Sequence, residues 1–427
     1  MPAVALTLIL FALTLAGVLT RPRGLSEAWF AALGGGLMLL TRRVSLAEAW
    51  QVTRESGDVL LFLLFLMALS ALVDTSGFFD WAATLAARAS KGDARRLLTL
   101  VFLLGAGITT LLSLDTTALL LTPLVWAVAS RAGLPLRPYL FACAFVANIA
   151  SSALPVANLT NLLAFEKIGD STLRYALVMT PATVGASLVT LAILRRVYRR
   201  ELPARFDASV FPDPLDAVPH LPYFRVTLVV LALTLVGYFA VPGLLGWPLW
   251  TVAALGASLL LLAGKRLGRV RARTVALRGV AWSVFPFVLG MFVVIRGVEN
   301  IGLANWLGGV LQSVGGESLP GRILAAAFGS AVGANLINNI PMCLLALTAL
   351  GDQGGTAPLY AAVLGVNLGP NVTVVGSLAT MLWRATLAQR GVEVTPGELA
   401  KAGLMVTVPA LLAACLLLWA TLALLSA

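Results

Sequence analysis

The sequence predicts an all-α polytopic membrane protein: two inverted repeats of five crossings, each with one re-entrant hairpin and one broken helix. Three observations support this. Of the 427 residues, 59% are hydrophobic and 11% are charged, whereas a soluble domain carries about a quarter charged residues. Apolar runs of membrane-crossing length recur along the whole chain. In each half, two otherwise apolar stretches also contain Asn, Ser, Thr, Gly and Pro.

The apolar runs set the number of crossings. A helix needs about 20 apolar residues to span a bilayer. Eight runs meet this length, at 2–20, 25–41, 57–75, 172–194, 223–241, 247–264, 280–298 and 403–425. Four less regular stretches lie between them. We expect 97–130 and 321–351 to be re-entrant hairpins, and 135–168 and 356–390 to cross with an unwound middle.

This pattern divides the chain into two halves with the same order of elements. The first repeat is expected over 1–200 and the second over 223–427. A linker rich in Arg and Pro, 201–222, joins them. Each half has five crossings, so the second half starts on the opposite side of the membrane from the first. Inverted repeats of this kind are typical of secondary transporters.

The basic residues predict the orientation. The chain has 30 Lys and Arg residues and a net charge of +11, and most of the basic residues fall in loops on one side. By the positive-inside rule that side is cytoplasmic, which places both termini outside the plasma (inner) membrane. Arg42, Arg43 and Arg54 fall on the opposite side. Because the charge follows the loops, we expect no nucleic-acid partner.

The polar residues inside the irregular stretches predict a solute site. Irregular backbone survives at membrane depth only where it is buried in protein or lines a wet cavity. Two matching broken segments indicate a transporter's midplane site. The substrate-binding residues predicted here are Thr116, Thr117, Asn148, Ser151, Ser152, Asn158, Asn161, Asn338, Asn339, Asn367, Asn371, Thr373, Ser377 and Thr380.

Asp115 is the acidic residue expected to function. It lies at the expected tip of the first hairpin. A carboxylate at membrane depth costs about 2.5–3.5 kcal/mol on the insertion scale, so such a residue is a functional candidate by default. Reversible protonation would make it the proton-coupling group. The alternative is that Asp115 only caps the hairpin's second helix, a position that Asp favours.

The neutral residues predict the kind of solute. Asn338 and Asn339 occupy the corresponding place in the second hairpin. An amide both donates and accepts hydrogen bonds without carrying charge, which suits a polar uncharged solute. The alternatives are that these residues cap the next half-helix, or that the Asn, Ser and Thr side chains bond neighbouring helices.

Enzyme and metal chemistry find little support. The single His220 lies in the linker, and Cys143, Cys343 and Cys415 have no paired spacing. No phosphate-binding loop for ATP is present. Cys143 and Cys343 lie close to the polar residues, but free Cys in apolar surroundings is usually a small buried hydrophobe. We expect no enzymatic activity, no cofactor and no metal site.

Several segments resemble the ArsB family of bacterial arsenite efflux permeases, within the wider ion-transporter superfamily. They are Arg21-Pro22-Arg23-Gly24-Leu25, Asp74-Thr75-Ser76-Gly77-Phe78-Phe79-Asp80-Trp81-Ala82, Leu120-Leu121-Thr122-Pro123, Asn338-Asn339-Ile340-Pro341 and Gly376-Ser377-Leu378-Ala379-Thr380-Met381-Leu382-Trp383. The resemblance implies efflux of arsenite or antimonite by elevator-like alternating access. It further implies coupling to proton entry or to a cytoplasmic ArsA-type ATPase.

The sequence departs from the family pattern at three places. The first hairpin tip of the family has Asn-Asp-Gly, and here it is Leu114-Asp115-Thr116. The family's two broken helices each carry an Asp where this chain has Asn148 and Asn367. The predicted site thus keeps only Asp115 as a charge, which suits a neutral trihydroxide. The alternative function is a sodium- or proton-coupled carrier of small organic anions, such as dicarboxylates or citrate.

Overall fold

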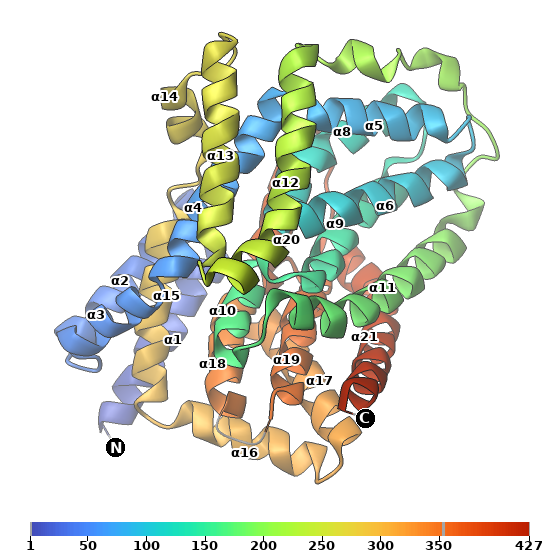
Figure 1. Ribbon diagram of the computed structural model, residues 1–427. Coiled ribbons are helices and arrows are strands. Elements are labelled where there is room, and N and C mark those ends of the chain that lie inside the picture. Colours follow the sequence, from blue (N-terminus) through green and yellow to red (C-terminus); the bar gives the residue numbers. More distant parts are fainter. Residues whose placement is uncertain (1, 352–354, 427) are drawn as a thin grey trace.

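The computed structural model describes residues 2–351 and 355–426, and within them it contains helices and no strand. Residues 1 and 427, the outer ends of the two predicted repeats, lie outside this part. The expected all-α architecture with many apolar helices is confirmed (Figure 1). Two apolar cores hold the helices together. One lies around the hairpins and broken helices, and the other around the first helices of each half.

The first half consists of helices α1 to α11. Their bounds are α1 Pro2–Thr20, α2 Glu27–Leu40, α3 Leu46–Glu55, α4 Gly57–Thr75, α5 Phe78–Ala89, α6 Ala94–Leu111, α7 Leu114–Thr116, α8 Thr122–Arg131, α9 Leu136–Ala150, α10 Leu159–Ile168 and α11 Thr172–Val197. A π-helical turn, Thr117–Leu121, joins α7 to α8. Helix therefore breaks inside both stretches for which the sequence predicts a hairpin or an unwound crossing.

The second half consists of helices α12 to α21. Their bounds are α12 Leu221–Leu245, α13 Leu249–Arg266, α14 Ala272–Thr274, α15 Val284–Glu299, α16 Leu303–Gly315, α17 Leu319–Ile337, α18 Asn339–Gly351, α19 Ala357–Leu368, α20 Leu378–Ala388 and α21 Pro396–Ser426. As in the first half, helix breaks between α17 and α18 and between α19 and α20.

The two halves repeat the same intervals along the chain. Gly77 precedes α5 with φ 80°, and Gly302 precedes α16 with φ 81°. Ser113 and Asn338, at the hairpin tips, follow these glycines at equal distance and also have positive φ. In Figure 1, α5 lies across the upper end of the molecule and α16 lies across the lower end. The inverted orientation of the halves stays a prediction that this arrangement favours.

Helices of each half also pack on helices of the other half. Helix α4 of the first half packs on α13 of the second, and α15 of the second packs on α2 of the first. At the α2–α15 contact a Cβ atom on Gly290 would collide with the backbone of Ala31. Small residues that allow such close approach are typical of helix contacts in membranes. Helices α11 and α21, the last of each half, pack on one another.

Seven helices in the described part of the chain are long and apolar enough to cross a membrane, and an eighth if α14–α15 and the turn between them form one bent span. Helix α2, with 14 residues, is shorter than these. The protein is therefore a multi-pass membrane protein. The count of ten crossings includes α2 and the two broken helices, and it stays a prediction.

Helix α3 shows how the termini of the short helices are fixed. Ser45 and Glu48 form a capping box, in which each side chain accepts a hydrogen bond from the other's backbone N–H. The side chain of Asn300, just after α15, donates to the Glu48 carboxylate at 3.0 Å. Hydrogen bonds from Ser45 and Asn300 hold the pKa of Glu48 below its ordinary value. This contact ties α3 to the end of α15.

The linker 201–222 is attached to the first half. The backbone N–H of Phe206 donates to the Gly92 carbonyl at 2.8 Å. Phe211 is buried, and the Arg88 guanidinium donates to its carbonyl oxygen at 3.3 Å. His220 caps α12 by accepting from the Tyr223 N–H at 3.2 Å. The linker thus runs along the upper end, whereas both described chain ends lie at the lower end (Figure 1).

Candidate solute site

The tip of the first hairpin is a sharp break in helix. Helix α6 ends at Leu111, and Ser113 follows with φ 151°. The Ser113 hydroxyl accepts from the Thr116 N–H at 3.2 Å and so caps the second arm. Asp115 lies in this first turn. Ser113, and not Asp115, therefore caps this turn. The Asp115 carboxyl group is left to contact the groups around the tip.

The tip of the second hairpin is built in a similar way. Asn338 has φ 75°, a conformation that Asn tolerates better than most residues. Its Oδ1 accepts from the Ile340 N–H at 3.3 Å, and its Nδ2 donates to the Val375 carbonyl at 3.0 Å. The neighbouring Asn339 is buried, and its Oδ1 has no hydrogen-bond partner in the described part of the chain.

Each broken helix ends in short helical turns and restarts at a capping residue. Helix α9 is followed by turns at Ser151–Ala153 and Pro155–Ala157, and α19 by turns at Gly369–Asn371 and Val374–Gly376. Asn158 then accepts from the Thr160 N–H at 3.4 Å. Ser377 accepts from the Thr380 N–H at 3.1 Å. Asn158 and Ser377 thus cap the restarting helices, a role that the sequence patterns did not predict for them.

Asn367 of the second half is bonded by the first half. Its Oδ1 accepts from the Asn158 amide at 2.8 Å and from the Thr160 hydroxyl at 2.7 Å. Its Nδ2 donates to Asn161 Oδ1 at 2.6 Å and to Ser152 Oγ at 3.1 Å. An Asn amide offers two donors and two acceptor positions. All four are used here, and every partner lies in the first broken helix.

Asn148 of the first half is bonded by the second half in return. Its Nδ2 donates to Asn371 Oδ1 at 2.9 Å and to Thr380 Oγ1 at 3.2 Å. Its Oδ1 accepts from the Ser377 hydroxyl at 3.4 Å. Asn148 and Asn367 thus make reciprocal bonds across the halves. We call these two residues and their side-chain partners the amide network: Asn148, Ser152, Asn158, Thr160, Asn161, Asn367, Asn371, Ser377 and Thr380.

The hairpins are tied to the same unwound segments. The Thr110 hydroxyl, near the end of α6, donates to the Ala150 carbonyl at 3.3 Å. At the corresponding place in the second half, Asn335 donates to the Gly369 carbonyl at 2.8 Å. These bonds satisfy carbonyls that the ends of α9 and α19 leave without helical partners. Hairpins and broken helices are therefore joined into one body.

A cavity of 260 Å³ lies around Asp115, between the first hairpin tip and α4. Apolar side chains such as Phe62 and Leu66 form much of its wall. Its polar lining residues are Ser70, Asp74, Ser113, Asp115, Thr116, Asn158 and Arg278. The Thr116 hydroxyl donates to Ser70 Oγ at 3.1 Å, which links the tip to α4. A small polar solute could therefore meet hydroxyls, an amide and a carboxyl group at this place.

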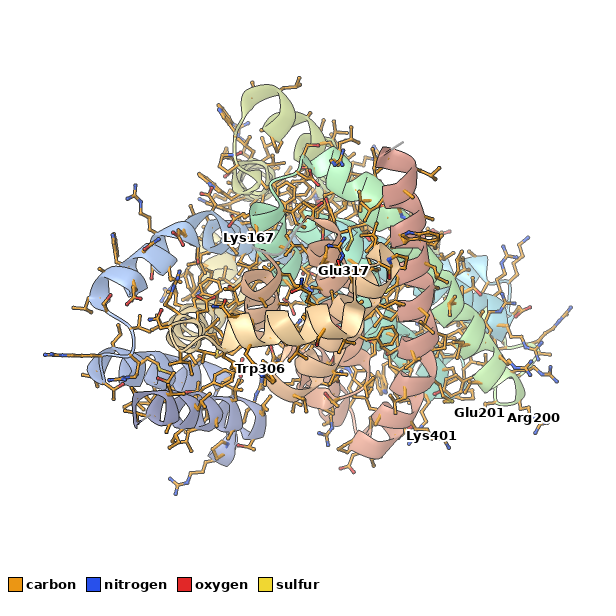
Figure 2. All side chains as sticks on the ribbon, turned by 90° about the horizontal axis from the view of Figure 1, so that it is seen from below. Lys167, Arg200, Glu201, Trp306, Glu317 and Lys401 are labelled. Atoms are coloured by element: carbon orange, nitrogen blue, oxygen red, sulfur yellow. The ribbon has the colours of Figure 1, made fainter. Side chains whose placement is uncertain are left out.

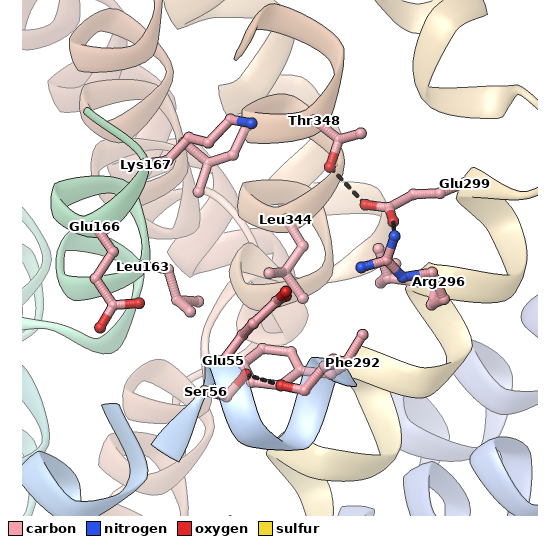
Figure 3. A pocket seen from close by; sticks show the side chains of 13 residues that line it. Glu55, Ser56, Leu163, Glu166, Lys167, Phe292, Arg296, Glu299, Leu344 and Thr348 are labelled. Atoms are coloured by element: carbon pink, nitrogen blue, oxygen red, sulfur yellow. Dashed lines mark hydrogen bonds and ion pairs between the residues drawn. The ribbon is translucent and has the colours of Figure 1, made fainter. Parts of the chain in front are cut away.

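A second cavity, of 320 Å³, lies between α15 and the α10–α18 pair (Figure 3). It is more strongly charged than the first. Its charged and hydroxyl-bearing lining residues are Glu55, Ser56, Glu166, Lys167, Arg296, Glu299 and Thr348. Helix α15 takes the place here that α4 has in the first cavity, and the second hairpin takes the place of the first.

Some predicted site residues line the first cavity, most of the others belong to the amide network, and none lines the second cavity. Their roles stay predictions. Asp115, Thr116 and Asn158 line the first cavity, and Asn158 also joins the amide network. Ser151 donates to the Asn148 carbonyl at 2.8 Å beside that network. Thr117 bonds Thr109, and Thr373 bonds Asn335, each at 2.7 Å.

Sequence reasoning missed several polar residues that the structure brings to the two cavities. Ser70 and Asp74 lie inside the apolar run 57–75, Arg296 lies inside the run 280–298, and Glu299 follows that run directly. Their position inside apolar spans was the available signal. Of the two cysteines near the site, both are buried, and the Cys343 thiol donates to the Thr160 carbonyl at 3.4 Å.

A family model described as arsenical pump membrane protein, ArsB, matches residues 6–422. The chain belongs to the ArsB family. It is 34% identical over 412 residues to the arsenical pump membrane protein of Escherichia coli K12, covering 94% of this chain and 95% of that protein. It is 27% identical to a putative arsenical pump membrane protein of Bacillus subtilis, over 93% of this chain and 95% of that one. The ArsB resemblance is therefore confirmed, and these relatives support a role as a membrane transport protein.

Two solved structures share the ArsB fold seen here. One is the YdaH transporter of Alcanivorax borkumensis, with a TM-score of 0.58, 14% identity and coverage of 97% of both chains. The other is MtrF of Neisseria gonorrhoeae, from a class of antimetabolite efflux pumps, with a TM-score of 0.55 and 15% identity, covering 97% of this chain and 94% of that one. At these identities the likeness concerns the fold alone.

Proposed function

We propose that the protein exports arsenite or antimonite, as the neutral trihydroxide, across the inner membrane. The observation that carries this proposal is the cavity around Asp115 in a chain of the ArsB family. A trihydroxide both donates and accepts hydrogen bonds. The hydroxyls of Ser70, Ser113 and Thr116 and the amide of Asn158 can do the same, and the apolar wall limits competition from water.

Asp115 is the group that we propose for proton coupling. It lies on the hairpin tip, at the border between the joined body of hairpins and broken helices and helix α4. A carboxyl group that releases a proton when the solute binds, and regains one when the solute leaves, would exchange the two. Because the trihydroxide is neutral, each exchange moves one net positive charge, the proton, in the direction opposite to the solute. The amide network is neutral and cannot take over this role.

The proposed movement is elevator-like alternating access. The amide network and the bonds of Thr110 and Asn335 join the hairpins and broken helices into one body. The two cavities lie along the border of this body, against α4 and α15. Sliding of the body against these two helices would open one cavity while closing the other, which is a domain movement of the shear kind.

The first experiment is arsenite uptake into everted membrane vesicles, with and without an imposed proton gradient. Asp115→Asn keeps the size of the side chain and removes its titration. We expect it to abolish the stimulation of uptake by the proton gradient. Glu317→Gln, in an exposed loop, is the matched control and is expected to behave as the unmodified protein. Full proton-coupled uptake by Asp115→Asn would refute the coupling role.

A second candidate function is transport of small organic anions, coupled to sodium or protons. The observation that favours it is Arg278, a cation that lines the Asp115 cavity and could pair with a carboxylate. Competition separates the two functions. Inhibition of arsenite uptake by antimonite, and none by citrate or succinate, supports the first. An ArsA-type ATPase partner remains a prediction, and uptake without ATP would show that it is dispensable.

A further inference from the structure

The last turns of α4 and α15 carry acidic residues at matching positions. Asp74 precedes Gly77 by the same interval as Glu299 precedes Gly302, and both glycines start a surface helix. Asp74 lines the Asp115 cavity, and Glu299 lines the second cavity. Each cavity therefore has one acidic side chain from the helix against which the joined body would slide.

The two acids differ in their contacts. The Thr348 hydroxyl, on α18 of the second hairpin, donates to Glu299 Oε1 at 2.5 Å. Arg296 Nη1 lies 3.5 Å from the other carboxylate oxygen (Figure 3). Asp74, by contrast, is exposed, and its carboxylate has no hydrogen bond or ion pair in the described part of the chain. One acid is engaged with its hairpin while its counterpart is free.

The remaining charged residues around Glu299 can form hydrogen bonds with a hydroxylated solute in the second cavity. Glu166 and Lys167 approach from α10, and Glu55 approaches from the end of α3 (Figure 3). Carboxylates accept hydrogen bonds from hydroxyl groups, whereas the Lys167 ammonium and the Arg296 guanidinium donate them. The Arg296 Nε is buried without a partner in the described part. The cavity thus offers both kinds of group.

We propose that the second cavity is the opposite mouth of the solute pathway and that Glu299 is its gating residue. This rests on the proposed function, in which a solute passes from one cavity to the other. The Glu299–Thr348 bond holds α18 against α15 in the state described here. When the joined body moves, this bond breaks, and Asp74 becomes the acid that faces its own hairpin.

If Glu299 gates the pathway, breaking its bond to Thr348 should change the accessibility of the two cavities in opposite directions. Leu163 lines the second cavity and Met67 lines the first. Each is replaced by Cys, one at a time, in a protein whose three native cysteines are replaced by Ala. Maleimide labelling is then measured in detergent, where both ends meet the reagent. We expect Thr348→Val to change the two labelling rates in opposite directions, each by at least about threefold, since loss of a hydrogen bond to a charged group shifts a two-state ratio by about tenfold or more.

Three further variants keep the test decisive. Thr348→Ser retains the hydroxyl and should label as the parent does. Glu299→Gln retains an acceptor without the charge and should shift both rates in the direction of Thr348→Val, by less. Glu317→Gln, in an exposed loop outside both cavities, should change neither. If Thr348→Val does not fold, Glu299→Gln supplies the same test.

Rates that stay unchanged, or that both rise, in Thr348→Val and Glu299→Gln would overturn the gate. The labelling needs no arsenite, so it is independent of the proposed solute. Reciprocal labelling in a protein that gives no arsenite uptake would leave the gate standing and refute the solute. Arsenite uptake by a protein whose two labelling rates do not change in opposite directions would refute the gate and leave the proposed solute standing.

Discussion

At the scale of single residues, Asn367 shows how much of the interior depends on amides. The orientation of its side chain is determined by its neighbour Asn161. The Asn161 Nδ2 donates to the carbonyl oxygens of Ser151 and Leu154, so its Oδ1 must face Asn367. Only an Nδ2 donor of Asn367 can meet that oxygen. The chemical identity of Asn367 is thus set by backbone carbonyls of the other half.

We predict that Asn367→Asp destabilises the protein, although the Asp side chain has nearly the same shape as the Asn side chain. The new carboxylate oxygen would lie where Nδ2 now lies, 2.6 Å from Asn161 Oδ1. Losing the donor leaves buried acceptors unsatisfied, at a cost of about 1–3 kcal/mol, or more if the carboxyl ionises. Thermal unfolding in detergent measures the effect. Asn305→Asp on the exposed side of α16 is the control, and equal unfolding temperatures for the two variants would contradict the prediction.

At the scale of elements, the C-terminal helix α21 is positioned by contact with the second broken helix. Gly403 of α21 lies against the Asn371 carbonyl and Val372, so closely that a Cβ atom would collide with this backbone. The backbone there is part of the unwound segment and holds Asn371 toward Asn148. Helix packing and the amide network are therefore coupled at this point.

Gly403→Ala should accordingly reduce stability. Forcing an extra methyl group into a packed interior costs about 1–3 kcal/mol. Gly397→Ala is the matched control, because Gly397 lies in the first turn of the same helix and a Cβ atom there would meet nothing within 4 Å. The midpoint of thermal unfolding should fall for Gly403→Ala and should not fall for Gly397→Ala. A parallel fall of both would show that the close contact does not matter.

Sequence patterns predicted elements well where hydrophobic runs were long. The spans expected at 57–75 and 2–20 are α4 and α1, almost residue for residue. The patterns were less informative at helix ends. The expected span 172–194 continues to Val197, because Arg195 and Arg196 extend the helix beyond its apolar part. The π-helical turn after α7 had no signal in the sequence, since its residues are ordinary helix formers.

The site was harder to predict than the fold, because residue type does not reveal the partner. Asn148 and Asp115 were both expected to meet a solute. Asp115 lines a cavity, whereas Asn148 is bonded by Asn371, Thr380 and Ser377. The difference arises from how the two halves meet, and this contact between distant segments leaves no local pattern.

At the scale of the whole molecule, the described chain ends and the linker lie at opposite ends. In Figure 2, the molecule is seen from the end that α16 covers, with Trp306 on α16 and Glu317 close to the end of that helix. The linker side carries Arg195, Arg196, Arg199 and Arg200. The positive-inside rule predicts that this is the cytoplasmic side and that the two termini are extracytoplasmic.

Reporter fusions test this orientation. Alkaline phosphatase, which is active only outside the cytoplasm, should be active when fused after the C-terminus and inactive when inserted after Asp213 in the linker. Green fluorescent protein should give the opposite pattern. A fluorescent C-terminal fusion would reverse the proposed orientation, and equal signals at both places would contradict an odd number of crossings in the second half.

The reciprocal bonds of Asn148 and Asn367 bear on how such a chain could have arisen. Either half alone would bury an amide whose acceptors and donors belong to the other half. In an apolar interior such an unpaired group is costly. A half-length ancestor could satisfy it only by pairing with a second copy of itself. The bonding pattern therefore suits descent from a symmetric dimer, whose two subunits were later joined by a basic linker into one polypeptide.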